Sequence, residues 1–172
     1  MAALVRGVNV GGTNKLPMPE LRAAVTALGG TDVVTLLNSG NVVFDHPRPA
    51  GLDAALATAL AERVGLVLTV MVRSGDEIAA VLAERPFGER TGEAGQHIGF
   101  LAGAPTPDAD ARLAALAAPG EAAVVSDRHV HVLLPLGAGR SKLAARLESV
   151  LVTPVTLRNR ATVGKLAGLT AG

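Results

Sequence analysis

Two hydrophobic periods alternate along the first half of the chain. Short apolar runs rich in β-branched residues predict strands, whereas apolar residues spaced three and four apart predict helices. Strands are expected at 2–5, 33–37, 42–44 and 66–72, and helices at 19–28 and 52–64. Glycines follow both helices, as is common at helix C-termini. The order βαββαβ is typical of a ferredoxin-like unit.

The second half repeats this order. Strands are expected at 97–101, 122–125, 129–134 and 155–157, and helices at 108–117, 141–150 and 162–169. We therefore predict an α+β protein with two ferredoxin-like βαββαβ units in tandem, whose antiparallel sheets are packed against helices. No residue-by-residue repeat is visible, so the duplication is inferred from the element order alone.

A connecting segment separates the two halves. Ser74 and Glu77 have the spacing of a capping box, and Pro86 ends the helix that follows. The stretch 84–96 is rich in charge, glycine and polar residues, which is typical of a linker. The expected division is half one at 1–73, a connecting helix and linker at 74–96, and half two with a C-terminal helix at 97–172.

Composition narrows the chemistry and the compartment. The chain has no cysteine, which excludes disulfides, thiol catalysis and cysteine metal sites. Its net charge is +1, so no global field favours nucleic acid or an acidic membrane. No apolar run reaches the roughly 20 residues that span a bilayer, and the N-terminus lacks the pattern of a signal peptide. We expect a soluble cytoplasmic protein with no membrane contact, in an undetermined oligomeric state.

A glycine-rich loop after the first strand is the strongest functional candidate. Glycine allows backbone N–H groups to approach a ligand closely, and cations beside it favour an anion. The candidate ligand-binding residues of this loop are Arg6, Asn9, Gly11, Gly12, Asn14 and Lys15. The loop is not a Walker A motif, because Thr13 stands where the lysine is required, and it lacks the dinucleotide-binding G-x-G-x-x-G pattern. An ordinary tight turn is the alternative.

Topology predicts what lies beside this loop. In an antiparallel βαββαβ sheet the first strand-to-helix loop and the hairpin between the second and third strands lie at the same end. The hairpin turn is Asn-Ser-Gly-Asn at 38–41, so Ser39 and Asn41 are expected to join the loop in one cluster.

A second polar cluster is expected in the other half. The loop before the helix at 141–150 and the exit of the last strand should share one end of the sheet. The residues concerned are Arg140, Ser141, Lys142, Arg158 and Asn159. Helix-start N–H groups beside cations suit a phosphate or carboxylate, and the alternative is an ordinary helix cap with solvated cations. We predict that both clusters face one cleft, where Arg6 and Arg140 clamp an anion.

Metal binding and catalysis have weaker support. His129 and His131 share one strand face and His97 begins another strand, but no supporting carboxylate is apparent, so we expect surface or half-buried histidines, no metal site and no cofactor. Ser39 lacks a G-x-S-x-G context. The carboxylates of residues 76, 77, 84, 89 and 93 are expected on a helix surface or linker, so catalytic residues remain unknown and enzymatic activity undecided.

Several motifs together resemble a bacterial family of uncharacterised proteins, the domain of unknown function 1697. They are Leu4 to Gly12, Asn14-Lys15, Met18, Leu21, Ser39 to Phe44, Val72 to Ser74, Gly139 to Leu143, Arg158-Asn159, Thr162-Val163 and Lys165-Leu166. The resemblance implies paired ferredoxin-like α+β units and no established activity. The family usually carries tryptophan after the Arg-Asn pair, where this chain has Arg160, so a stacking role for that aromatic is absent.

Two classes of function remain in view, with a third behind them. The loops of Gly, Asn, Arg and Lys favour a small anionic ligand, with phosphorylated compounds among the candidates. The alternative is a nucleic-acid-binding module, because RNA-recognition domains share the ferredoxin-like fold. Such domains stack bases on sheet aromatics, and here the strands offer only Phe44 and Phe100. A protein-interaction module is the third possibility.

Overall fold

The computed structural model describes residues 1–47, 50–88 and 95–171. Within these ranges the chain divides into two compact units. The first unit comprises Met1–Ala79 and Leu166–Gly172, and the second comprises Ala80–Lys165. The expected division into half one at 1–73, a connecting helix and linker at 74–96 and half two at 97–172 stays a prediction, and part of the expected linker, 89–94, lies outside the described residues.

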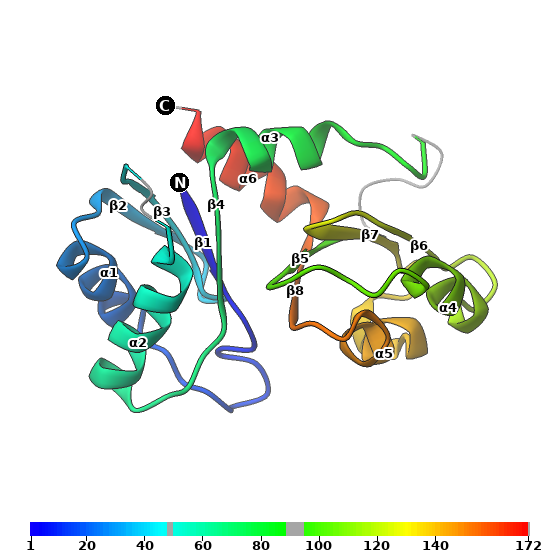
Figure 1. The fold of residues 1–172 in the computed structure, drawn as a ribbon, viewed down its shortest axis with the longest axis horizontal. Coiled ribbons are helices and arrows are strands. Elements are labelled where there is room, and N and C mark those ends of the chain that lie inside the picture. The colour runs from blue at the N-terminus through cyan, green and yellow to red at the C-terminus, as the bar shows by residue number, and fades with distance from the viewer. Residues whose placement is uncertain (48–49, 89–94, 172) are drawn as a thin grey trace. The chain divides into compact units, whose positions relative to one another are not determined.

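The first unit contains one four-stranded antiparallel sheet (Figure 1). Its elements are β1 (Ala2–Val5), α1 (Met18–Ala27), β2 (Thr31–Leu36), β3 (Asn41–Asp45), α2 (Leu52–Val64) and β4 (Val70–Arg73). The strand order is β2-β3-β1-β4, with α1 and α2 on one face of the sheet. This is the arrangement that the βαββαβ order predicts.

The core of the first unit lies between this sheet and its two helices. Val5, Phe44 and Val72 from the strands are buried with Leu21 of α1 and Leu56 of α2. The opposite face of β1 and of its neighbour β4 is also buried, at Ala2, Leu4 and Met71. Strand β1 is therefore apolar on both faces, which explains why it appears in the sequence as a continuous apolar run.

The second unit repeats the topology (Figure 1). Its strands and sheet-covering helices are β5 (Gln96–Leu101), α4 (Ala109–Leu116), β6 (Ala122–Val125), β7 (His129–Leu133), α5 (Lys142–Leu151) and β8 (Val155–Asn159). The order β6-β7-β5-β8 matches that of the first unit position by position, and all pairings are antiparallel. The predicted fold class is confirmed.

The two faces of the second sheet differ in chemistry. On one face Val130 and Val132 are buried in a cluster with leucines of α4 and α5. The register pairs Ile98 with His131 and Phe100 with His129, and paired residues project to the same side. These four side chains therefore lie on the face opposite α4 and α5, which we call the histidine face.

Two further helices continue from the fourth strands. Helix α3 (Gly75–Ala83) follows β4, and α6 (Arg160–Thr170) follows β8. Each begins in one unit and ends in the other. Among the helices that the structure describes, none combines the length and the apolar character needed to cross a bilayer.

Several strand boundaries differ from the expected ones, and two of them show a physical reason. Strand β4 begins at Val70, not at residue 66, because its partner β1 ends at Val5, which is opposite Val70. Strand β8 continues to Asn159, beyond the expected residue 157, because β5 supplies partners as far as His97. In both cases the length of the neighbouring strand sets the boundary, which apolar content alone does not report.

The duplication extends to individual residues at the ends of β4 and β8. In β4, Nη1 of buried Arg73 donates to the carbonyl of Val72 at 2.9 Å. In β8, Nη1 of buried Arg158 donates to the carbonyl of Leu157 at 2.8 Å. Each arginine thus bonds to the carbonyl of the residue before it, a correspondence that the sequence alone did not reveal.

The residue after each arginine caps the next helix. Ser74 Oγ accepts from the Glu77 N–H at 3.1 Å, and Glu77 Oε2 accepts from the Ser74 N–H at 2.7 Å, which confirms the capping box. Asn159 Oδ1 accepts from the Thr162 N–H at 2.8 Å. In both caps the side chain therefore accepts from the backbone N–H of the residue three positions later.

Candidate functional site

The glycine-rich loop folds back on itself between β1 and α1. Five residues have positive φ, a conformation that glycine and asparagine adopt most readily: Gly7, Asn9, Gly11, Gly12 and Asn14. The reversal is closed by the Thr13 N–H, which donates to the Val10 carbonyl at 3.1 Å. The spacing of Gly and Asn in the sequence thus follows the backbone conformation that each position requires.

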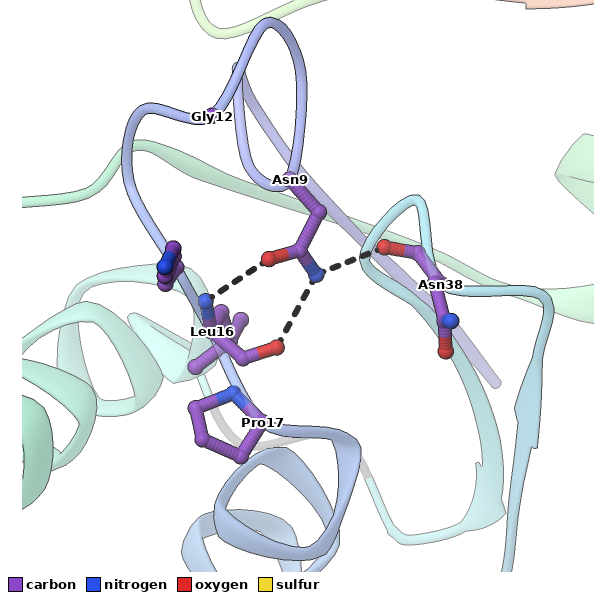
Figure 2. A pocket seen from close by; sticks show the side chains of 6 residues that line it. Asn9, Gly12, Leu16, Pro17 and Asn38 are labelled. Carbon is purple, nitrogen blue, oxygen red and sulfur yellow. Dashed lines mark hydrogen bonds between the residues drawn. The ribbon is translucent and has the colours of Figure 1, made fainter.

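Asn9 fastens the loop at its base (Figure 2). Its Nδ2 donates to the Leu16 carbonyl at 2.9 Å and to the Asn38 carbonyl at 2.7 Å. Its Oδ1 accepts from the Leu16 N–H at 3.0 Å. One amide side chain therefore joins the loop, the start of α1 and the β2–β3 hairpin turn.

The hairpin turn lies directly against the loop, as predicted. The Val5 N–H donates to the Gly40 carbonyl at 2.8 Å. Gly40 has φ +76°, and a Cβ there would lie 2.6 Å from Val8 Cγ2 and 2.9 Å from Val5 Cβ. A side chain at this position would therefore push the turn away from the loop.

A hollow of about 490 Å³ opens beside the loop. It is lined by Asn9, Gly12, Lys15, Leu16, Pro17 and Asn38 (Figure 2). Lys15 is exposed, whereas Leu16 is buried and forms an apolar wall. The hollow thus combines one cation, two amides and glycine backbone with an apolar wall.

The other side chains expected in this cluster do not line the hollow. Asn14 Nδ2 donates to the Gly7 carbonyl at 3.1 Å, within the loop. Asn41 is fully buried, and its Nδ2 donates to the Leu36 carbonyl at 3.1 Å and to Ser39 Oγ at 2.9 Å. These bonds hold the turn and the loop in shape. Ligand contact by Arg6, Asn14, Ser39 and Asn41 stays a prediction.

The second predicted cluster begins at the start of α5. Ser141 is the N-cap, and its Oγ accepts from the Ala144 N–H at 3.0 Å. Arg140 and Lys142 on either side of it are exposed. The cap that the sequence predicts is therefore present, with solvated cations beside it.

Arg158 and Asn159 lie at the same end of the sheet as this cap, because β7 and β8 both end beside the start of β5. However, Arg158 is opposite Ile98 in the register and so projects from the histidine face, whereas α5 covers the other face. Arg158 Nη1 also donates to Thr156 Oγ1 at 2.8 Å, and burial lowers the pKa of its guanidinium to about 10. The five residues thus share an end of the sheet but not a face.

A group that the sequence analysis did not assemble lies on the histidine face. His129 Nε2 and His131 Nε2 are each 3.0 Å from Glu84 Oε2, just after the end of α3. The expectation of surface or half-buried histidines without a carboxylate is wrong for this pair, because both rings are buried and Glu84 contacts them. His97 is paired with Val132 and lies on the opposite face.

Burial and charge set the protonation of this group. Burial lowers the pKa of His131 below its usual value, and the hydrogen bond to Glu84 offsets only part of this effect. Burial raises the pKa of Glu84, but the hydrogen bonds and charges of His129 and His131 outweigh it, so the net shift is downward. A lowered pKa keeps Glu84 ionised and a lowered pKa keeps His131 neutral at neutral pH, and the near-complete burial of His131 supports the neutral ring.

Arg160 holds the end of α3 in place. Its side chain is buried, and Nη1 donates to the Glu84 carbonyl at 3.1 Å, while Nη2 donates to the Leu82 carbonyl. The guanidinium therefore satisfies carbonyls that a helix C-terminus leaves without partners. This contact fixes the backbone from which the Glu84 carboxylate projects.

Comparison with known proteins identifies the family. The family model described as a protein of unknown function, DUF1697, matches residues 1–131. The chain belongs to the DUF1697 family. A solved structure, described as that of the conserved bacterial protein SP0830 from Streptococcus pneumoniae, is 23% identical to this DUF1697 chain with a TM-score of 0.73. The match covers 98% of this chain and 97% of that one, and it supports the fold alone. No curated protein matches the chain.

Sequence reasoning missed three parts of the sites in this DUF1697 protein. The first hollow is also lined by Leu16, Pro17 and Asn38. Only the position of these residues beside the loop and the turn could have indicated that they line it. For Glu84, the available signal was its position at the end of a helix. A second hollow, of about 430 Å³, lies between α4 and α5, with Arg112 and Arg146 among its lining residues. Nothing in the local sequence pairs those two arginines.

Proposed function

We propose that this protein binds a small anionic ligand in the hollow beside the glycine-rich loop, and that phosphorylated metabolites are the first class to test. The observation that carries the proposal is the placement of Lys15 and Gly12 on the wall of one hollow. A lysine supplies charge, and exposed loop backbone supplies donors, which together suit phosphate or carboxylate oxygens.

The tip of the loop leaves room for close approach. A Cβ built at Gly11 or at Gly12 would meet nothing within 4 Å. The N–H groups of Gly11, Gly12 and Lys15 donate no hydrogen bond within 1–47, 50–88 and 95–171. These donors are therefore available to a ligand.

The walls of the hollow are held in advance of binding. The three hydrogen bonds of Asn9 fix Leu16 and Asn38 relative to the loop. A preorganised site loses less conformational entropy on binding, so more of the contact energy appears as affinity. Its volume of about 490 Å³ lies within the range of small-molecule pockets.

The nucleic-acid alternative has less support. Phe44 and Phe100, the aromatic residues of the strands, are at most 2% exposed. RNA-recognition sheets stack bases on exposed rings, which these two residues do not offer. The protein-interaction alternative has one favourable observation, because Val34 and Leu37, in and just after edge strand β2, are 48% and 56% exposed.

Isothermal titration with pyrophosphate and with ribose 5-phosphate tests the proposal. Wild type is expected to bind at least one of them, and Lys15→Ala should weaken binding by about tenfold or more, since a charge-assisted hydrogen bond contributes about 1.5–3 kcal/mol. Lys165→Ala is the matched control, because it removes an exposed lysine that does not line the hollow. Equal weakening by both variants, or no binding by wild type, would contradict the proposal.

Further arms separate the remaining possibilities. Arg6→Ala and Arg140→Ala test the predicted clamp, which requires both to weaken binding of the same ligand. Arg112→Ala with Arg146→Ala tests the second hollow as the anion site instead. Titration with RNA and DNA oligomers at several salt concentrations tests the alternative, where tight binding that weakens steeply with salt would favour nucleic acid.

A further inference from the structure

We infer that Glu84, His129 and His131 form a binding site for one divalent transition-metal ion, with Zn²⁺ the best match. The ligand set is two imidazole nitrogens and one carboxylate oxygen, and these three atoms lie within 4.8 Å of one another. Two His and one Glu is a ligand set that zinc enzymes use when a fourth position is left for water. This site shares no residue with the hollow beside the glycine-rich loop.

The distances require only a small adjustment of the carboxylate. Each Nε2 is now 3.0 Å from Glu84 Oε2, a hydrogen-bond distance. Zinc bonds of about 2.0–2.1 Å in a tetrahedral arrangement place ligand atoms about 3.3 Å apart. The carboxylate must therefore move away from each ring by a few tenths of an ångström.

Strand geometry aims both histidines at one point. His129 and His131 are two residues apart on β7 and so project from the same face. Their rings are 5.1 Å apart at 88°, and their exposures are 9% and 2%. Burial of this degree restricts the rings to few rotamers, which lowers the entropy lost on coordination.

Access to solvent comes from the carboxylate side. The side chain of Glu84 is 45% exposed, although the two rings that it contacts are buried. An ion can therefore enter beside Glu84, and a water molecule can occupy the fourth position. A closed structural zinc site has no such opening.

The charge state of the group suits coordination. A metal binds the lone pair of a neutral imidazole, and burial lowers the pKa of His131 in that direction. The ionised Glu84 supplies the negative charge that offsets part of the metal's charge. On binding, the proton on each Nε2 must be displaced, either to Nδ1 of the same ring or to solvent.

Arg160 both supports and limits the site. Its bonds to the carbonyls of Leu82 and Glu84 position the backbone that carries the carboxylate. Its charge is also close enough to His131 to lower that pKa, and it repels a bound cation in the same way. We therefore expect weaker affinity than that of a fully enclosed structural zinc site.

Metal titration of the full-length chain, free of any affinity tag and stripped with a chelator, tests the inference. Calorimetry with Zn²⁺ alone should give one ion per chain, and Co²⁺ should give the visible absorption of a four-coordinate complex. Glu84→Gln should weaken zinc binding by more than about 100-fold, because loss even of an outer-shell partner costs 10–100-fold. This variant changes an exposed side chain, so it is expected to fold.

Matched histidine variants complete the design. His97→Ala alters the opposite face of the same sheet, and His46→Ala lies in the first unit, so both should bind zinc as wild type does. His129→Asn should weaken binding as Glu84→Gln does. Absence of zinc binding by wild type, equal binding by wild type and Glu84→Gln, or loss of binding in His97→Ala would each overturn the assignment.

Discussion

The two units share a strand order but use it for different chemistry. In the first unit, the sheet face opposite α1 and α2 is apolar along β1, at Ala2 and Leu4. In the second unit, the corresponding face carries His129 and His131 beside Ile98. In this duplicated scaffold the face is apolar along β1 of one copy and carries a histidine cluster in the other, while each copy has a buried arginine in its fourth strand, Arg73 and Arg158.

The loops after the first strand of each unit also differ, and here the candidate polar site lies in the first unit. The first unit has glycines and asparagines with positive φ between β1 and α1, and a hollow beside them. The corresponding β5–α4 loop of the second unit is tied by the Gly103 N–H, which donates to Thr153 Oγ1 at 2.9 Å. Polar function is thus expected in a loop of the first unit and on a sheet face of the second.

The largest expected effect comes from the two buried phenylalanines. Phe44 belongs to the core under the helices, whereas Phe100 lies on the histidine face. Phe44→Ala and Phe100→Ala should each lower the free energy of unfolding by about 3–5 kcal/mol, measured by urea denaturation. If the sheet faces differ as described, only Phe100→Ala also changes zinc titration, and an equal effect of both on zinc would contradict the comparison.

Close approach of the backbone gives the next largest effect. A Cβ at Gly99 would lie 2.7 Å from Val155 Cγ2 and 2.8 Å from Val130 Cγ1. Gly99→Ala should cost about 1–3 kcal/mol of unfolding free energy through overpacking. Adding Val130→Ala should recover part of this loss, whereas additive effects would show that the clash is not the cause.

Gly40→Ala makes the matching change in the first unit. Here a positive φ adds to the steric contact with Val8, so the loss should exceed that of Gly99→Ala. The turn should also move away from the glycine-rich loop and reduce anion binding, which titration with pyrophosphate measures. Gly99→Ala should leave that binding unchanged.

The duplicated helix caps should give equal and smaller effects. Ser74→Ala and Asn159→Ala each remove the side chain that accepts a helix N–H, and each should cost about 1 kcal/mol in thermal or urea unfolding. Asn159 was also predicted to bind ligand. A loss of anion affinity in Asn159→Ala at unchanged stability would show that the cap is not its main role.

The smallest effect is a pH dependence confined to the second unit. The folded-state pKa of His131 is lowered, so the unfolded chain binds its proton first as pH falls. In chelator, stability should be full above about pH 6.5 and decline below it, toward the folded pKa of His131. Glu84, His129 and Arg160 face this ring, and Glu84 adds a further loss as pH falls through its own lowered pKa.

Urea denaturation across this range measures the effect. His131→Asn removes the titrating ring and should flatten the decline that begins below about pH 6.5. An identical decline in wild type and His131→Asn would assign it to other groups.

Most of the fold could be predicted because local signals agree with it. The helix at 52–64, the capping box at Ser74 and the N-cap at Ser141 all depend on residues within a few positions of one another. The ends of β4 and β8 could not be predicted in the same way. They depend on partners in β1 and β5 that lie far along the chain.

The parts of the candidate sites also differ in whether the sequence could predict them. The contact between loop and turn follows from antiparallel topology, so it could be predicted. The contact of Glu84 with His129 and His131 spans 45 and 47 residues and depends on where α3 ends, so sequence spacing does not reveal it. Likewise, the face on which Arg158 projects follows from its register with Ile98, which hydrophobic patterning leaves open.

The last seven residues, Leu166–Gly172, belong to the first unit although they follow the second in the chain. Gly75 shows how closely they pack there, because a Cβ on it would lie 3.0 Å from the Thr170 carbonyl oxygen. During synthesis the N-terminal part of a protein emerges first and can begin to fold before the rest is made. Here the first unit includes the second half of α6, so its fold can be completed only after the whole second unit has been synthesised.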